Sequence, residues 1–313
     1  MLVLKFQKGY RVPEIKIGEF SVGINNKPFI IAEMSGNHNQ SLNRALKIVE
    51  KAAEVGVNAI KLQTYTPDTM TLDISDGDFF IKDKTSLWFG KSLYDLYKVA
   101  HTPWEWHDII MKKANELGLI CFSTPFDETA VDFLEDLNVP AYKIASFENS
   151  YIPLIRKVAA TGKPVIISTG MASVGQISEA VKVVKQAGCE QFILLKCTSS
   201  YPANPADANI LTIPHLRKLF NCEIGISDHT KGIGCSIAAV SHGASIIEKH
   251  LTLSRSDKGV DSKFSLEPNE MKLWVEESER AWLSIGEVKY GPTFIERKSM
   301  IFRRSIYVSE NLK

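Results

Sequence analysis

Eight short apolar segments recur along the chain, each followed by a stretch with helical periodicity. They are residues 29–34, 59–63, 119–123, 141–146, 164–169, 192–197, 223–227 and 245–249. Strands this apolar are buried on both faces, as parallel strands are. An open doubly wound sheet gives a similar alternation, but eight regular units favour closure. The pattern predicts an α/β fold, a (β/α)8 TIM barrel spanning residues 29–285.

Three stretches fall outside this repeat. Residues 1–28 carry turn signals at Gly18 and at Asn25-Asn26, and we expect a β-hairpin that plugs the bottom of the barrel. Residues 66–102 form a long insertion rich in aromatic residues after the second strand, which we expect to act as a lid or substrate wall. Residues 286–313 read as a polar tail, and no second domain fits after it.

Composition excludes several classes of partner. Lys+Arg is 37 and Asp+Glu is 36, and the net charge of +1 is not that of a nucleic-acid or acidic-membrane binder. The five cysteines include no CxxC pair, which disfavours a disulfide framework and a thiolate zinc site. No apolar run approaches the ~20 residues of a membrane span, and the start lacks the core of a signal peptide. We expect a cytoplasmic protein that binds small molecules.

Two of the seven histidines, His229 and His250, follow the ends of the seventh and eighth predicted strands. Active sites of such barrels lie at the carboxyl ends of the strands, where neighbouring strands bring side chains together. Two imidazoles need oxygen donors from water, substrate or Glu33 to complete a metal site, which suits Mn²⁺ or Mg²⁺ better than structural zinc. The alternative is that each is a hydrogen-bonded structural histidine.

Three lysines, Lys61, Lys143 and Lys196, also end strands. Lysine is rarely buried unless it is paired. Hydroxyl side chains surround all three, namely Thr124, Ser146, Ser168, Thr169, Thr198, Ser199 and Ser227. Cations with hydroxyl and backbone donors form phosphate and carboxylate pockets. A Schiff-base lysine or internal ion pairs are the alternatives, but a Schiff-base aldolase needs only one such lysine, so three favour anion binding.

Carboxylates and one cysteine complete the candidate set. Glu33 and Glu148 end strands in the same mouth, and each is a candidate general base or sugar-hydroxyl acceptor. Charge balance for the lysines is the alternative for both. Asp261, after the eighth strand, is a candidate to bind substrate or orient a metal ligand. Cys197 has no neighbouring histidine or base in the sequence, which favours packing over nucleophilic chemistry.

The strand-end strings IAEMSGNHNQSL, IKLQTYTPDT, CFSTPFD, AYKIASFE, ISTGM, LKCTSSYP, GISDHT and IEKHLTL occur in this order. Together they resemble the sialic acid synthase family of nonulosonate synthases, which condense phosphoenolpyruvate with an amino sugar. The resemblance runs from about Ile17 to Tyr307. At QTYTPD, TPWEWH, ASFE and DSKFSL the chain looks most like the pseudaminic acid branch, and less like the sialic and legionaminic acid branches.

The resemblance implies a role for each matching position. His229 and His250 match the family's metal-binding histidines, and Glu33 matches a catalytic carboxylate near the metal. The positions that match phosphoenolpyruvate contacts are Lys61, Thr124, Lys143, Ser146, Ser168 and Ser227. The positions that match amino-sugar contacts are Gln63, Glu148, Tyr201 and Asp261, while Ser199 stands where sialic acid synthases often have Asn.

The implied reaction is a metal-dependent condensation of phosphoenolpyruvate with a 2,4-diacetamido-2,4,6-trideoxy hexose, giving pseudaminic acid and phosphate with C–O cleavage. The missing 6-hydroxyl suits an apolar wall, for which Phe147 and Phe264 are candidates. Family members usually continue into an antifreeze-protein-like domain that covers the partner's site in a dimer, and RRSIYVSENLK looks like the lead-in to it. We expect a homodimer, with weak sugar binding in a chain that lacks this cap.

Several alternatives stay open. Within the family, the product is N-acetylneuraminic or legionaminic acid instead. Outside it, the chain is another phosphoenolpyruvate or phosphosugar barrel, such as an aldolase or a 3-deoxy-heptulosonate type synthase. A non-catalytic sugar-binding barrel is the alternative of another class. Against that last reading, the set Glu33, Lys61, Lys143, His229 and His250 is complete.

Overall fold

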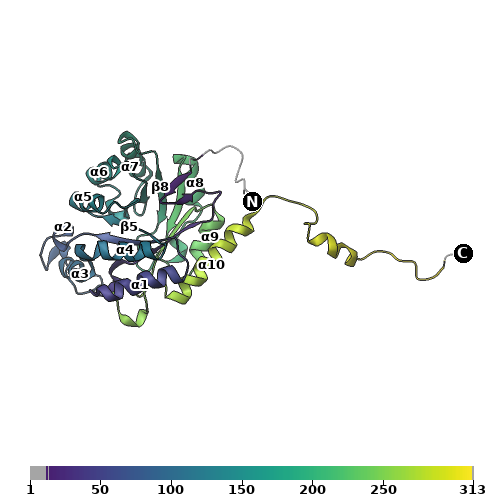
Figure 1. Ribbon diagram of the computed structural model, residues 1–313, viewed down its shortest axis with the longest axis horizontal. Helices are drawn as coiled ribbons and strands as arrows, with labels where there is room; N and C mark the ends of the chain where they lie inside the picture. Colours follow the sequence, from purple (N-terminus) through teal and green to yellow (C-terminus); the bar gives the residue numbers. More distant parts are fainter. Residues whose placement is uncertain (1–11, 13, 312–313) are drawn as a thin grey trace.

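The computed structural model describes residue 12 and residues 14–311. Eight parallel strands close a barrel in the order β10-β3-β4-β5-β6-β7-β8-β9, which confirms the predicted (β/α)8 fold (Figure 1). The strands are β3 Phe29–Glu33, β4 Ala59–Thr64, β5 Ile120–Pro125, β6 Tyr142–Ile144, β7 Val165–Ser168, β8 Phe192–Cys197, β9 Glu223–Ser227 and β10 Ile246–His250. Each of the eight apolar segments supplies one of them.

Helices surround the barrel, and the longer ones bury an apolar stripe. They are α1 Leu42–Glu54, α2 Pro67–Met70, α3 Leu93–Ala100, α4 His107–Glu116, α5 Glu128–Asp136, α6 Ile152–Ala160, α7 Val174–Gln186, α8 Thr212–Phe220, α9 Gly234–Ser241 and α10 Pro268–Ile285. Helix α1 shows the pattern, since its buried residues Ala45, Ile48, Val49 and Ala52 follow helical spacing. Short 3-10 helices are η1 Ser35–His38, η2 Gly77–Phe79, η3 Trp104–Trp106, η4 Ser146–Glu148, η5 Pro205–Asp207, η6 Arg255–Asp257 and η7 Glu296–Phe302.

A β-hairpin closes the amino-terminal end of the barrel, as predicted. Strands β1 Ile15–Ile17 and β2 Phe20–Val22 pair antiparallel. Gly18 turns the chain between them with φ +57°, and a Cβ there would lie 2.5 Å from Ile120 Cδ1. The buried face of the hairpin packs on the apolar interior of the barrel. Residues 1–11 and 13 of the predicted hairpin segment lie outside the described residues.

The barrel interior changes from apolar to polar along its axis. Side chains two residues apart on a strand face the same side. The lower layer, packed with the hairpin, includes Ile31, Ala59, Phe122, Ala141, Ile166 and Ile246. The residues two positions further along are Glu33, Lys61, Thr124, Lys143, Ser168 and Glu248. Strand alternation therefore stacks a polar layer directly on an apolar floor.

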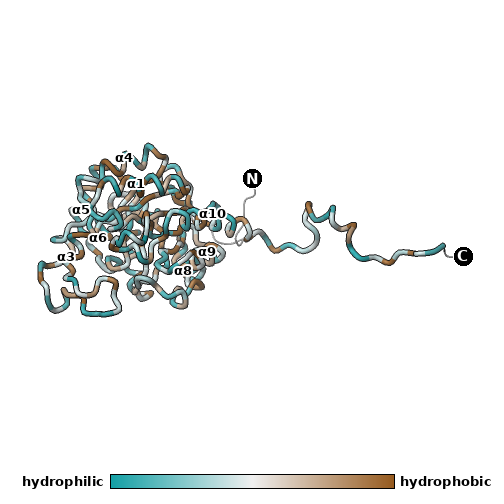
Figure 2. Tube along the Cα trace, turned by 90° about the horizontal axis from the view of Figure 1, so that it is seen from below, coloured by the Kyte–Doolittle hydropathy of each residue, from teal (hydrophilic) through white to brown (hydrophobic). Residues whose placement is uncertain are grey.

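Two segments leave the barrel wall. The insertion of residues 66–102 contains α2, η2 and α3. After α10 the tail runs away from the barrel as an extended segment interrupted by η7 (Figure 1), and Figure 2 shows apolar and polar residues interspersed along it. Among the described residues, no helix combines the length and the hydropathy that crossing a membrane requires.

Candidate active site

A cavity of about 630 Å³ opens at the carboxyl ends of the strands. Nearly all of the predicted site residues line it together. They are Glu33, Lys61, Gln63, Thr124, Lys143, Ser146, Glu148, Ser168, Tyr201, Ser227, His229, His250 and Asp261. Ser199 is the exception, because it lies behind Cys197 with its Oγ 3.7 Å from the sulfur.

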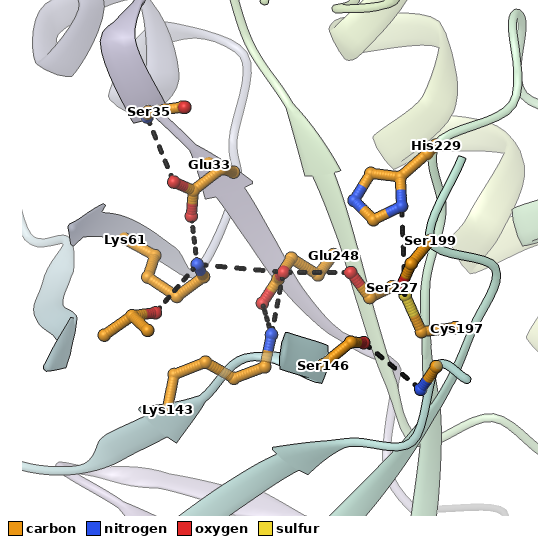
Figure 3. Close-up of polar contacts among 12 residues, drawn as sticks. Glu33, Ser35, Lys61, Lys143, Ser146, Cys197, Ser199, Ser227, His229 and Glu248 are labelled. Carbon is orange, nitrogen blue, oxygen red and sulfur yellow. Dashed lines mark hydrogen bonds and ion pairs between the residues drawn. The ribbon is translucent and has the colours of Figure 1, made fainter. Parts of the chain in front are cut away.

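Two buried lysine–carboxylate pairs form the floor of this cavity (Figure 3). Lys61 pairs with Glu33 and donates to Thr124 Oγ1 at 3.2 Å. Lys143 Nζ lies 3.0 Å from both carboxylate oxygens of Glu248. Each of the four charged side chains is at most 4% exposed. Two cations and two carboxylates thus balance one another where water does not screen them.

Glu248 was missed by the sequence analysis, although it joins the two pairs. It contacts Lys143, accepts a hydrogen bond from Ser227 Oγ at 3.1 Å, and lies 3.8 Å from Lys61 Nζ. The signal was present in the string IEKH. Because alternate strand residues share a face, a histidine at position 250 in the mouth requires Glu248 to face the same interior.

The two floor carboxylates differ in their proton affinity. Burial raises the pKa of Glu33 to about 7, against the lowering effect of Lys61. Burial also opposes ionisation of Glu248, but Lys143 and Lys61 outweigh it and lower its pKa to about 2. Carboxyl groups whose environments separate their pKa values in this way are candidates for different acid–base roles. Glu33 is the one suited to exchange a proton near neutral pH.

The two histidines lie face to edge with their ring centroids 5.4 Å apart. His229 Nδ1 donates to the Thr198 carbonyl at 3.1 Å, which leaves its Nε2 lone pair free. His250 Nδ1 is buried and has no hydrogen-bond partner among the described residues. Burial, reinforced by His229 and Lys61, lowers the pKa of His250 well below its usual value, so its ring is neutral.

Neutral imidazoles with free lone pairs are metal ligands. No cluster of three His, Cys, Asp or Glu side chains arranged for a metal occurs in the part of the chain that the structure describes. The two imidazoles, with ring centroids 5.4 Å apart, would supply part of the ligand set of a divalent ion, and its remaining ligands would come from water and substrate. Asp261 accepts from Ser35 Oγ and lies 3.6 Å from His250 Nδ1, a position suited to orienting that ring.

A backbone amide and several serine hydroxyl groups lie beside the floor of the cavity. Gly170 N donates to Ser146 Oγ at 3.1 Å. A Cβ on Gly170 would lie 2.3 Å from Ser199 Oγ and 2.6 Å from Ser146 Oγ, so only glycine fits. Ser168 Oγ, buried in the cavity wall, has no hydrogen-bond partner within the described chain. This hydroxyl is free to donate to a bound anion.

The structure corrects three expectations. Lys196 does not join the anion pocket, because strand alternation turns it outward, where Nζ donates to the Cys197 carbonyl at 3.0 Å. Phe264 packs against His250, with their ring centroids 4.8 Å apart, and does not line the cavity. Cys197 does have a histidine neighbour, with Sγ 3.8 Å from His229 Nδ1. Burial opposes ionisation of this thiol, but the contact with His229 lowers its pKa to about 7.

The insertion forms one wall of the cavity, as expected of a long loop at this face. Its lining residues are Met70, Ile81, Ser86, Trp88, Leu93, Leu96, Tyr97 and Ala100. Trp88 Nε1 donates to the Val260 carbonyl at 3.0 Å, and its ring lies 5.9 Å from that of Tyr201. These contacts fix the insertion to the loops after β10 and β8. The aromatic residues Phe79, Phe80, Phe89 and Tyr94 do not reach the cavity.

Known proteins resemble this chain over most of its length. The profile of the NeuB family matches residues 48–290. Pseudaminic acid synthase from Campylobacter jejuni is 41% identical over 299 residues, which cover 96% of this chain and 86% of that protein. The pseudaminic acid synthase of Helicobacter pylori is 41% identical over 288 residues, covering 91% and 84%.

A solved structure shares the whole barrel. The crystal structure of N-acetylneuraminic acid synthetase from Leptospira borgpetersenii superposes with a TM-score of 0.83 at 34% identity. The match covers 95% of this chain and 98% of that one. The expected resemblance to sialic acid synthases is therefore confirmed, and the chain belongs to the NeuB family.

Proposed function

We propose that this enzyme condenses phosphoenolpyruvate with a 2,4-diacetamido-2,4,6-trideoxy hexose to give pseudaminic acid and phosphate. Its family relatives are synthases, which makes it a transferase. The observation that carries the proposal is the cavity floor, where two buried lysines, hydroxyl groups and the imidazoles of His229 and His250 converge. The 41% identity to two pseudaminic acid synthases supports the choice of sugar.

Phosphoenolpyruvate carries a phosphate and a carboxylate, and the floor offers two cations. Lys61 and Lys143 hold these two groups, and Ser168 Oγ, which lacks a partner among the described residues, donates a further hydrogen bond. Charge-assisted bonds of this kind strengthen in a buried site as negative charge develops. Glu33 and Glu248 keep the lysines charged and in position before the anion arrives.

The condensation then needs one carbon–carbon bond and one carbon–oxygen cleavage. Carbon three of phosphoenolpyruvate attacks the aldehyde carbon of the open-chain sugar, and the oxygen of a water adds at carbon two. The bond from carbon two to the phosphate oxygen breaks and phosphate leaves with the electron pair, while the carbon-two hydroxyl gives its proton to the departing phosphate and becomes the ketone of the product. Glu33 takes the proton of the attacking water and returns it to the oxygen of the former aldehyde.

His229 and His250 would hold a divalent ion, Mn²⁺ or Mg²⁺. When bound, such an ion supplies Lewis-acid polarisation of the aldehyde. Gln63, Glu148, Tyr201 and Asp261 line the remaining cavity and orient the sugar.

We also propose a reducing, cytoplasmic setting and a homodimer. All five cysteines are free, which supports the first. Large apolar side chains along the tail are exposed, and exposed apolar surface of this kind marks association sites, which supports the second.

The test is phosphate release from phosphoenolpyruvate with Mn²⁺, and then with EDTA. The 6-deoxy diacetamido-altrose and N-acetylmannosamine are supplied in parallel. We expect metal-dependent release with the altrose only. Release with N-acetylmannosamine would assign the enzyme to sialic acid synthesis instead. Release that EDTA leaves unchanged would contradict the metal role of His229 and His250.

A further inference from the structure

The cavity changes in polarity from its floor to its mouth. The floor side chains Glu33, Lys61, Lys143 and Glu248 are ionisable and buried. The wall supplied by the insertion is mostly apolar, and its members are Met70, Ile81, Trp88, Leu93, Leu96, Tyr97 and Ala100. Ser86 belongs to this wall too, but its Oγ accepts a hydrogen bond from Trp88 N at 3.2 Å within its own loop.

Helix α3 organises this wall. Leu93, Leu96, Tyr97 and Ala100 follow helical spacing, so one face of the helix points into the cavity. Ser92 caps the helix by accepting from Asp95 N at 3.0 Å. Trp88, just before the helix, is held by its bond to the Val260 carbonyl. The wall is therefore built before any ligand binds.

The candidate residues for an apolar wall were Phe147 and Phe264. Phe264 is 2% exposed and does not line the cavity. Phe147 lines it but is 61% exposed, so most of its ring faces solvent. The insertion supplies more apolar side chains to the cavity lining, and among them Leu96 and Ala100 are buried.

We propose that α3 and the segment leading into it select sugars whose end remote from the aldehyde is a methyl group. This rests on the proposed function, because the aldehyde carbon must reach the anion on the charged floor. Carbon six, at the other end of the chain, then lies against Leu93 and its neighbours. A 6-methyl buries apolar surface there, whereas a 6-hydroxyl loses its bonds to water.

Leu93→Ser tests this assignment. The affinities of the wild type and the variant for the 6-deoxy diacetamido-altrose and for its 6-hydroxy counterpart are measured by calorimetry with phosphoenolpyruvate present. Phosphate release is followed in parallel. The wild type should prefer the 6-deoxy sugar by about 10- to 100-fold. Leu93→Ser should lower that preference about tenfold and leave phosphoenolpyruvate binding unchanged.

Two further variants control the test. Leu72→Ser makes the same change at a position of the insertion that is 60% exposed and outside the cavity, and it should keep the wild-type preference. Leu93→Met keeps the apolar surface and should keep the preference too. Equal losses for both sugars in Leu93→Ser would overturn the assignment, and so would a wild type without a 6-deoxy preference. A 6-deoxy preference in binding without phosphate release would support the wall while contradicting the proposed reaction.

Discussion

Buried charges at the barrel floor must be balanced within the protein. Lys143 and Glu248 are both nearly inaccessible, and each oxygen of the carboxylate lies 3.0 Å from the ammonium group. The exposed pair of Lys157 with Asp132 has a similar contact distance of 2.6 Å. Solvent screens the second pair and not the first, so the two should respond very differently to loss of one partner.

Lys143→Met should therefore lower the free energy of unfolding by about 3 kcal/mol. It should also lower kcat/KM at least 100-fold, because one cation of the anion site is lost. Urea unfolding and phosphate release measure the two effects. The control Lys157→Met should cost no more than about 1 kcal/mol and leave activity unchanged. Adding Glu248→Gln to Lys143→Met should restore stability without restoring activity, and recovery of both would contradict a role in binding phosphoenolpyruvate.

Glu148 should make stability depend on pH. Burial raises the pKa of its carboxyl from 4.5 to about 7, so the folded state holds the proton more tightly than the unfolded chain does. The stabilising contribution is complete below pH 4.5 and is lost as the pH rises to about 7. The unfolding free energy of the wild type should fall as the pH rises from 4.5 to about 7. In Glu148→Gln this decrease should be smaller by about 1–3 kcal/mol. Glu116→Gln, at an exposed position on α4, should follow the wild type.

Single residues show where sequence reasoning reaches its limit. The polar residues at strand ends were predictable because parallel strands end at one face of a barrel. Lys196 and Glu248 were misjudged for one reason, namely that residues were assigned by proximity to a strand end and not by the face on which they lie. The contact between Cys197 and His229 joins neighbouring strands through side-chain conformations that the sequence does not specify.

The barrel strands could be placed from the sequence because burial on both faces makes them uniformly apolar. The insertion was predictable as a wall but not in detail. Its loops have no periodicity to show which side chains face inward, and the bond from Trp88 to Val260 spans 172 positions in the chain. Aromatic content pointed equally to Trp88 and to Phe89, whereas only Trp88 lines the cavity.

Trp88→Phe should weaken the attachment of the insertion and still leave an aromatic ring in the cavity wall. The ring stays apolar, but the hydrogen bond to the Val260 carbonyl is lost. We expect the KM for the sugar to rise about fivefold, the worth of one such bond, while the KM for phosphoenolpyruvate is unchanged. Steady-state kinetics with each substrate varied in turn measure this. The control Trp282→Phe on α10 removes an indole N–H that lacks a partner within the described residues. Equal effects of both variants would contradict a specific role for the Trp88 bond.

At the scale of the whole molecule, the barrel and the tail differ in how they are held. The tail leaves the barrel after α10, and its apolar side chains are open to solvent, with Phe294 79% and Phe302 81% exposed. Burial in the barrel, not the tail, supplies the stability of the fold.

Deleting residues 290–313 should therefore change the free energy of unfolding by no more than about 0.5 kcal/mol. Removing exposed apolar surface should also reduce self-association. Urea unfolding and sedimentation velocity over a range of protein concentrations measure the two effects. A loss above about 2 kcal/mol would mean that the tail packs on the barrel in solution.

The hairpin of β1 and β2 closes the barrel at the end opposite the mouth, so that the cavity has a single opening. Under the proposed function, phosphoenolpyruvate binds on the floor and enters before the sugar that fills the space above it. The phosphate that the proposed reaction forms at the floor would leave after the nine-carbon product. Catalysis should follow a compulsory sequence, in which an unreactive sugar analogue inhibits competitively against the sugar and uncompetitively against phosphoenolpyruvate. Topology alone would thereby set the order in which molecules enter and leave.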